Sequence, residues 1–544
     1  MKINFPGWQI QKIEPWIFGL MVLVNLVPIY FNTYFLTGDG PCHIYNAKVL
    51  LDFWTGHNQE FYAPYYYLNT NFEPNYLTSY LLAFFLSFLP DYLAEKALLT
   101  TYLLTFAFSM RWLLGKIHPA NKVFALAGMP FIYQQALQMG FFNYSMSIAL
   151  MFLILAYWLH NREKFTPVKQ LLICILGVLM FFTHAGGLTL TILILGSFWL
   201  MDLIVKTIKD RSVVSKNIKI WKNEAINLII CFLPAVLLLL AYISRKGLSV
   251  SPGADSFEQL KERILNLSAL VNLSAKEEIY ASYLAYFFIF LLIAGIITKI
   301  YSRKFNAFDV FFLLAILAIY VYFNMPNTLA GGSILSIRFQ CIPYFLLILW
   351  YGSLHWHNLF RWITLIVCSI IGIGFIAVRQ PIHRLVSNGV VEYTSVREHI
   401  PDQSTVLPLS YSHNGKTPEG DLICEKLWLF MHAADYIGTD KSMVLFGNYE
   451  ANTGYFPLLW HWDRNPFRQL AVGGRGFEEQ PPSADIRAYP EKSQTGRIDY
   501  VILWCIEEDS GQIDHTRNIL TQLGESYEAI FTSENGLAVL YKRK

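Results

Sequence analysis

Polar side chains of a few types stand at the ends of long apolar segments, where polar groups are costly unless they line a site or path. The set holds carboxylates, histidines, amides and an arginine. A carboxylate can act as a general base, and a guanidinium can bind a phosphate through two parallel hydrogen bonds. Such a mixture is typical of an active site rather than of a channel. Its members are Asp39, His43, Glu73, Asn75, Gln138, Asn143, His184 and Arg338.

Asp39 stands in the segment Thr37-Gly38-Asp39-Gly40-Pro41-Cys42-His43, directly after the first apolar run. Its flanking glycines let the backbone bend, so that the carboxylate can point into a cavity and take a proton from a hydroxyl group. An Asp in this pattern equally suits a turn or the N-cap of a helix that starts near Pro41. His43, four residues on, would share a helical face with Asp39. It would orient the carboxylate, bind substrate or face solvent.

The remaining candidates also have an ordinary structural explanation beside a functional one. Glu73 is a second acid, a metal ligand or an exposed loop acid, and Asn75 beside it is counted with the substrate-binding residues. Gln138 and Asn143 can bind sugar hydroxyls or satisfy the backbone where two half-helices meet. His184 lies at a glycine-rich turn and is either a ligand or an interfacial residue.

Arg338 lies just inside the start of an apolar run, so its charge needs a partner. A lipid-linked phosphate is the natural partner, because a guanidinium pairs with phosphate through two hydrogen bonds. The alternatives are contact with lipid headgroups and an internal ion pair with Asp39.

The composition identifies the elements that must position these residues. Hydrophobic residues make up 54% of the 544 residues, and charged residues make up 15%, against about 25% in soluble domains. The net charge of +3, without a basic tract, argues against nucleic-acid binding and against disorder. The chain is therefore predicted to be a polytopic α-helical membrane protein.

About eleven apolar segments are predicted to cross the membrane. They are 16–35, 92–115, 123–138, 141–160, 169–183, 187–204, 225–243, 283–301, 307–323, 337–353 and 362–378. The shorter segment 76–89 is counted as interfacial, because the basic loops then share the cytoplasmic side with the N-terminus. The segment 123–138 is short, and it forms either a span or a re-entrant pair with 141–160.

This topology gives a transmembrane domain over residues 1–380 with outward loops at 37–91 and 244–282. Residues 381–544 carry more charge, Pro and Gly, and form a predicted extracytoplasmic α/β domain. Its expected elements are strands at Ser404–Leu409, Tyr500–Trp504 and Leu537–Tyr541 and a helix at Glu425–Ala434.

Motifs for ATP-driven pumps, zinc proteases and dinucleotide enzymes are absent from the sequence, so any energy must come with the substrate. The seven cysteines form no CxxC pair and no metal-binding spacing. No residue is assigned to a metal, and a divalent cation (Mg or Mn) is the one cofactor considered.

The segment from Leu36 to Leu89 resembles the GT-C glycosyltransferases, a broad group of protein mannosyltransferases, aminoarabinose transferases and uncharacterised bacterial relatives. In that group an outward loop with an essential Asp follows the first span, and a short helix and a Pro-initiated surface segment come next. Thr37–His43, Ala47–Trp54 and Pro74–Leu89 look like these features. The resemblance implies a GT-C-like fold over about the first 380 residues, a polyprenyl-phosphate-sugar donor, and Asp39 as the general base.

Two positions depart from the pattern of that group. Many members have paired acids in the first loop, where Asp39 is followed by Gly40. Many also have an acid in the second outward loop, where this chain has Gln138 and Asn143. Both departures weaken the case for a bound metal.

The sequence therefore predicts a glycosyltransferase that moves a sugar to a lipid, glycan or protein acceptor on the periplasmic side of a bacterial inner membrane. One alternative is an O-antigen-type ligase or polymerase, which usually carries its large outer segment between late spans. A non-enzymatic transporter or scaffold is the other. Transporters favour polar residues near the midplane and inverted repeats, and neither feature is found in the sequence.

Overall fold

The computed structural model describes residues 7–209, 214–247, 249–253, 255–493 and 496–544. The chain divides into two compact units, each assembled from segments far apart in the sequence. The helical unit comprises Met1–Val27, Thr100–Leu137 and Asn143–Val378. The mixed unit comprises Pro28–Leu99, Gln138–Phe142 and Arg379–Lys544. Most of the predicted first outward loop thus belongs to the same unit as the C-terminal region.

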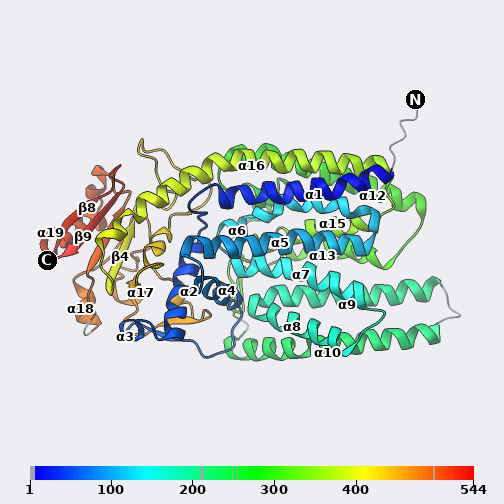
Figure 1. The fold of residues 1–544 in the computed structure, drawn as a ribbon, viewed down its shortest axis with the longest axis horizontal. Coiled ribbons are helices and arrows are strands. Elements are labelled where there is room, and N and C mark those ends of the chain that lie inside the picture. Colours follow the sequence, from blue (N-terminus) through cyan, green and yellow to red (C-terminus); the bar gives the residue numbers. More distant parts are fainter. Residues whose placement is uncertain (1–6, 210–213, 248, 254, 494–495) are drawn as a thin grey trace. The chain divides into compact units, whose positions relative to one another are not determined.

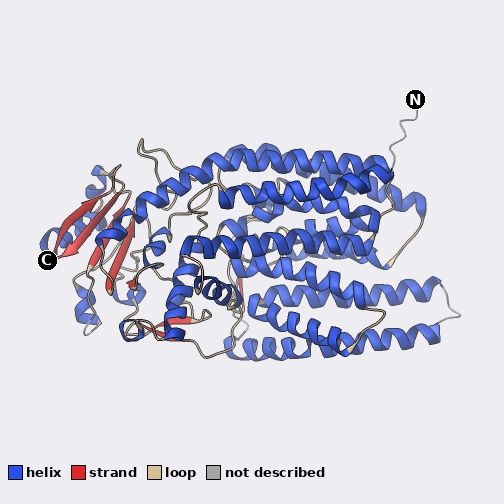
Figure 2. Ribbon diagram, viewed as in Figure 1, coloured by secondary structure: helices blue, strands red, loops and turns tan. Residues whose placement is uncertain are grey.

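Long helices make up the helical unit, and Figures 1 and 2 show them running side by side. They are α1 (Gly7–Tyr30), α5 (Asp91–Ile117), α7 (Phe142–Asn161), α8 (Pro167–Thr183), α9 (Ala185–Lys209), α10 (Val214–Lys246), α12 (Glu278–Ser302), α13 (Val310–Phe323), α15 (Ile342–Ser353) and α16 (Asn358–Thr394). Shorter elements join them, namely η1 (Pro119–Tyr133), α6 (Gln135–Gln138), α11 (Phe257–Leu265), α14 (Leu335–Phe339) and the antiparallel pair β2 (Val250–Ser251) and β3 (Thr328–Leu329). Helices α5 and α16 each contribute residues to both units.

Eight helices in the described part of the chain are long and apolar enough to cross a membrane. They are Gln9–Tyr30, Asp91–Ile117, Phe142–Asn161, Ala185–Ile208, Ile218–Lys246, Ala275–Ser302, Leu335–Ser353 and Asn358–His399. Each overlaps one of the predicted spans, and the predicted spans 169–183 and 307–323 are shorter apolar helices. The segment 123–138 forms the 3₁₀ helix η1 followed by the four-residue α6. The predicted count of eleven is therefore not confirmed.

The segment 76–89 forms helix α4 (Leu77–Leu86), which has ten residues. At 1.5 Å per residue it is about 15 Å long, half the thickness of the hydrocarbon core of a bilayer. Its exposed side chains include Tyr80 and Phe84, and Phe88 just beyond it is also exposed. Aromatic residues of this kind are common at membrane interfaces. Helix α4 is too short to span, as expected from the basic loops.

A five-stranded sheet and several short helices make up the rest of the mixed unit. The strands are β4 (Ser404–Ser410), β5 (Met443–Leu445), β7 (Tyr500–Trp504), β8 (Tyr527–Thr532) and β9 (Ala538–Arg543). Their order is β5-β4-β7-β9-β8, with β4 parallel to β5 and β7, and β9 antiparallel to β7 and β8. The central β7 is buried at every position, which matches its continuous apolar sequence. The three predicted strands are therefore present.

Other elements of this unit are helices and a small second sheet. They are α2 (Gly40–Thr55), α3 (Gln59–Tyr62), α17 (Pro466–Gln469), α18 (Ala488–Lys492), α19 (Asp514–Ser526), and the antiparallel pair β1 (Tyr66–Leu68) and β6 (Leu458–Trp460). Three short 3₁₀ helices also matter for the site: η6 (Ser395–His399), η7 (Ala433–Gly438) and η8 (Glu450–Asn452).

The predicted helix at Glu425–Ala434 is wrong. These residues form turns, and the helical η7 begins only at Ala433. Tertiary hydrogen bonds hold the turns, because the N–H of Phe430 donates to the carbonyl of His413 and the Asn414 amide donates to the carbonyl of Cys424. Contacts made by residues distant in the sequence thus override the local helical pattern.

Candidate functional site

Helix α2 follows Asp39 directly and is short and largely buried. Pro41 in its first turn favours a helix start, and Gly56 in the left-handed conformation (φ 74°) ends it. Asp39 occupies the N-cap position, but its side chain makes no capping hydrogen bond. The proposed capping role for the Asp39 carboxylate is therefore wrong, and the side chain is partly buried, at 18% exposure.

The backbone around Asp39 is held by the segment that follows Leu137. The N–H of Gly38 donates to the carbonyl of Gln138 at 2.9 Å, and the N–H of Asp39 donates to the carbonyl of Met139 at 3.0 Å. A Cβ on Gly38 would lie 2.7 Å from the Met139 oxygen, and a Cβ on Gly140 would lie 2.4 Å from the Asp39 nitrogen. Gly140 also has a φ of +89°. Close approach of two backbones is therefore the reason for these glycines.

His43 is clamped between an acid and a carbonyl. Its Nδ1 lies 2.6 Å from Oε1 of Glu450, and its Nε2 lies 2.9 Å from the carbonyl oxygen of Gly140. Burial alone would lower the pKa of His43, but the charge of Glu450 reverses this effect and raises the pKa to about 9. His43 is therefore an imidazolium at neutral pH, and both N–H groups donate. It helps to position Asp39, because it binds the carbonyl of Gly140 and the carbonyl of the adjoining Met139 accepts the N–H of Asp39.

Two amides complete the environment of Glu450, and all these residues are buried. The Asn46 side chain donates to Oε2 of Glu450 at 2.7 Å. Asn46 and Asn448 form a reciprocal pair, with N···O distances of 3.1 and 2.9 Å. The Cys42 thiol donates to Asn448 at 3.3 Å. One face of α2 is therefore bound to η8 and to the loop before it through a buried polar network.

A stacked pair of rings stands beside the Asp39 carboxylate. Nε2 of His432 lies 4.0 Å from Oδ1 of Asp39, and the His432 ring stacks on Tyr449 with centroids 4.5 Å apart. Burial lowers the pKa of His432 to about 3, so this imidazole is neutral. Burial and the nearby charges of Asp39 and Glu450 raise the pKa of Tyr449 well above its ordinary value. The carboxylate thus faces two neutral hydrogen-bonding groups.

Two further acids lie near the start of α2. Oε2 of Glu95 accepts a hydrogen bond from the Tyr436 hydroxyl at 2.6 Å, and a Cβ on Gly40 would lie 2.7 Å from Oε1 of Glu95. Asp435 is 1% exposed. Burial raises the pKa of Asp435 to about 8, and the charge of Glu450 adds to the rise. Asp435 therefore carries its proton at neutral pH.

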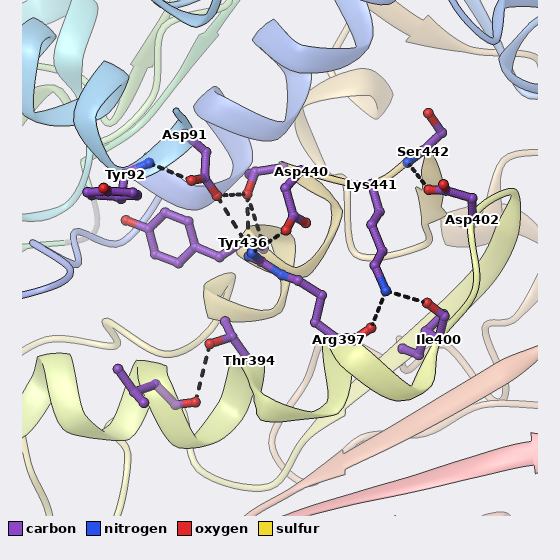
Figure 3. A network of polar contacts seen from close by, with 12 residues as sticks. Asp91, Tyr92, Thr394, Arg397, Ile400, Asp402, Tyr436, Asp440, Lys441 and Ser442 are labelled. Carbon is purple, nitrogen blue, oxygen red and sulfur yellow. Dashed lines mark hydrogen bonds and ion pairs between the residues drawn. The ribbon is translucent and has the colours of Figure 1, made fainter. Parts of the chain in front are cut away.

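An ion-pair network fixes η7, which carries Asp435 and Tyr436. Figure 3 shows the guanidinium of Arg397 beside the carboxylates of Asp440 and Asp91, at 3.0 and 3.8 Å. Arg397 also donates to the carbonyl oxygen of Tyr436. A further contact of 3.4 Å to the Thr439 hydroxyl gives this cation four oxygen partners. It holds the end of η7 in place, since so short a helix has little internal hydrogen bonding of its own.

The other predicted residues of the mixed unit lie at different depths. Glu73 is 1% exposed, so its interpretation as an exposed loop acid is wrong. Asn75 is partly buried and has a φ of 70° just before α4. The Gln138 side chain is fully buried, and neither of its polar atoms has a hydrogen-bond partner within the residues described. Such an orphaned amide is rare and marks a place for a further polar group.

Arg338 and His184 meet in the helical unit. Nη1 of Arg338 lies 3.0 Å from Nε2 of His184, and the Tyr144 hydroxyl donates to the Arg338 carbonyl. They line a cavity of about 350 Å³ whose other walls come mainly from α9, α13 and α15. Leu193, Leu317 and Leu346 are among its apolar lining residues. Asn143, at the start of α7 in the same unit, is 4% exposed.

The residues around Asp39 do not fit the divalent cation considered from the sequence. Glu450 is engaged with His43 and Asn46, and Asp435 is protonated at neutral pH. Over the ranges that the structure describes, no group of three or more His, Cys, Asp or Glu side chains could hold a metal.

Sequence reasoning singled out Asp39 but not its neighbours in the structure, which are Glu450, His432, Glu95 and Asp435. The contact between Asn46 and Glu450 joins residues 404 positions apart. No local pattern in the sequence predicts a contact between residues so far apart. The acid after the first span was found because a Gly-Asp-Gly-Pro sequence is unusual at the end of an apolar run.

Comparison with known proteins finds likeness in structure but not in sequence. No family model and no curated protein matches the sequence. The crystal structure of ArnT from Cupriavidus metallidurans in the apo state is similar over 96% of this chain and 97% of that chain, with 10% identity and a TM-score of 0.48. At that identity and score the likeness carries no argument about activity. The chain is a mostly helical protein, and eight helices among its described residues are long and apolar enough to cross a membrane.

Proposed function

We propose that the chain is a GT-C-like membrane glycosyltransferase that moves a sugar from a polyprenyl-phosphate donor to an acceptor hydroxyl, with Asp39 as the general base. The observation that supports the proposal is how the backbone of Asp39 is held and how far its side chain is exposed. Its backbone is held on one side by Met139, its carboxylate is not used as a helix cap, and the side chain keeps 18% exposure. A general base must be held in place and reachable by substrate.

The reaction follows from this placement. The acceptor hydroxyl gives its proton to the Asp39 carboxylate, and its oxygen forms a bond to the anomeric carbon of the donor sugar. The bond from that carbon to the phosphate oxygen breaks, and the electron pair leaves with polyprenyl phosphate. His432, neutral and 4.0 Å from Asp39, can hydrogen-bond the acceptor beside the base.

Arg338 is the proposed binding group for the donor phosphate. A guanidinium stabilises the negative charge that grows on the leaving phosphate. The cavity that it lines, about 350 Å³ and largely apolar, is suited to part of a prenyl chain. His184 positions the guanidinium through the 3.0 Å contact.

The orphaned amide of Gln138 is the proposed partner for a sugar hydroxyl. A sugar hydroxyl both donates and accepts, and would satisfy both polar atoms of this side chain. Glu73, Asn75 and Asn143 remain proposed substrate-binding residues. His43 is reassigned to positioning, because Glu450 and Gly140 occupy both of its ring nitrogens.

The proposed setting is the inner membrane of a bacterium, with the N-terminus in the cytoplasm and residues 381–544 in the periplasm. The distribution of basic loops supports this orientation. The acceptor is a lipid, a glycan or a protein, and membrane lipids surround the spans.

The test measures transfer of radiolabelled sugar from a panel of polyprenyl-phosphate sugars to membrane-extract acceptors. Purified wild type is compared with Asp39→Asn, at equal folded yield. Loss of the base should lower transfer about 10²- to 10⁴-fold. The control is Asp463→Asn, an acid of the same unit whose side chain is 59% exposed. Unchanged transfer in Asp39→Asn would refute the role of Asp39, and absence of transfer by wild type from every donor would refute the proposed donor class.

A further inference from the structure

A second cavity of the helical unit lies at the C-terminal end of α12. Its volume is about 270 Å³, and its lining includes Lys299, Ser302, Arg303, Lys304, Phe305 and His355. The span Ala275–Ser302 ends at this point, so the cavity lies where a membrane-crossing helix stops. None of these residues has a role in the transfer reaction proposed above.

The cavity carries an excess of positive charge. Nζ of Lys299 lies 2.5 Å from Oδ1 of Asp309, so these two charges offset each other. Asp309 also accepts hydrogen bonds from the Trp350 indole at 3.2 Å and from the Asn306 N–H at 2.8 Å. Within the part of the chain that the structure describes, no ion pair is found for Arg303 or Lys304. Two exposed cations therefore remain at the cavity.

The backbone alone does not hold an anion here. The carbonyl end of a helix carries partial negative charge, which repels an anion. The N–H of Arg303 is used within the helix end, since it donates to the carbonyl of Lys299 at 2.9 Å. Any anion at this cavity is therefore bound by side chains.

An apolar stripe leads along α12 to the same cavity. Ile293, Ile297 and Ile300 recur at helical spacing on one face and are 55%, 47% and 65% exposed. Phe305, which lines the cavity, is 64% exposed. A free phosphate ion would contact the cations alone. A phospholipid would place its headgroup on the cations and an acyl chain on the stripe.

We propose that this cavity is a binding site for an anionic phospholipid. The phosphodiester of the headgroup lies against Arg303 and Lys304, and an acyl chain lies along the exposed face of α12. Basic pockets where membrane helices end are suited to such headgroups, because each cation near the membrane surface strengthens attraction to an anionic lipid. The glycerol hydroxyls of the headgroup can reach Ser302.

The test uses the purified full chain in detergent and short-chain phosphatidylglycerol as the probe. The apparent Kd is measured from the rise of the thermal unfolding midpoint with lipid concentration. The variant is Arg303→Gln combined with Lys304→Gln. The control is Lys219→Gln combined with Lys222→Gln, which removes two exposed cations from α10 of the same unit.

Removal of Arg303 and Lys304 should weaken phosphatidylglycerol binding about 30-fold, since each charge contributes a factor of about 5. The control should change the Kd less than about 3-fold. Phosphatidylcholine of the same chain length should bind wild type at least about 10-fold more weakly than phosphatidylglycerol.

Three results would overturn the proposal. Equal weakening in the control would mean that charge anywhere on the unit attracts the lipid. Equal binding of phosphatidylcholine and phosphatidylglycerol would remove the role of headgroup charge. Binding of glycerophosphoglycerol as tightly as the lipid would identify a site for a soluble phosphodiester.

Discussion

Replacing Glu450 by Gln removes the charge that keeps His43 protonated. The pKa of His43 rises from 6.5 to about 9. A change of one pKa unit corresponds to about 1.36 kcal/mol, so this rise of about 2.5 corresponds to roughly 3 kcal/mol of favourable interaction. Because the folded-state pKa is the higher one, this stability is fully present below pH 6.5. It is lost as the pH rises through about 9.

The Glu450→Gln variant keeps the size of the side chain and an acceptor for Asn46. It lacks the charge, and burial then lowers the pKa of His43, so the imidazole is neutral at pH 7. Wild type should lose most of the His43 contribution between pH 6.5 and 10. The variant should be less stable at pH 7 by about 2–3 kcal/mol, and its thermal midpoint should not fall between pH 8 and 9.5 on account of His43.

The assay is the thermal unfolding midpoint in detergent, followed by tryptophan fluorescence from pH 5 to 10. Asp435 also titrates, and its pKa of about 8 lies above the ordinary 3.8. Its contribution to the stability is therefore lost as the pH rises from 3.8 to about 8. The window from pH 8 to 9.5 therefore reports mainly on His43. Asp435→Asn is the matched control and should keep the decline in that window. A Glu450→Gln variant that declines as steeply as wild type there would refute the assignment of His43 as an imidazolium.

Two further predictions concern geometry and the donor. Gly140→Ala should lower transfer at least about 10-fold and destabilise the protein by about 2 kcal/mol, because φ is +89° and the new Cβ would lie 2.4 Å from the Asp39 nitrogen. Gly524→Ala, in helix α19 with nothing within 4 Å of its Cβ, is the control and should leave transfer and the thermal midpoint unchanged or slightly raised. Arg338→Gln should raise the KM for the donor about 10- to 100-fold, because it removes charged hydrogen bonds to the phosphate. Arg245→Gln, an exposed cation of the same unit, should leave that KM unchanged, and an equal rise would contradict a specific phosphate site.

The membrane helices could be predicted because the signal is local. A run of about 20 apolar residues has few other stable uses, and eight such helices in the described part of the chain overlap predicted spans. Asp39 could be singled out for the same reason, since a charged residue between glycines interrupts the pattern at the end of the first run, and its role stays a prediction.

The rest of the site depends on contacts between distant segments. Helix α2 was predicted only as a short helix after the first apolar run, and most of its residues are buried. Its polar residues Cys42, His43 and Asn46 suggest a solvated face until their partners Asn448 and Glu450 are known. The same cause explains the wrong helix at 425–434, where the carbonyl of His413 holds the chain in turns.

The choice of Asp39 among four neighbouring acids follows from what each carboxyl already does. Glu450 is committed to His43 and Asn46, and Glu95 accepts from Tyr436 while only 3% exposed. Asp435 carries its proton at neutral pH, so it is not a base there. Asp39 also has Tyr449 as a hydrogen-bonding neighbour, but it has a fixed backbone, no capping role and a side chain that is 18% exposed. In the proposed mechanism, Glu450 and Glu95 therefore hold the framework, Asp435 keeps its proton, and Asp39 accepts one.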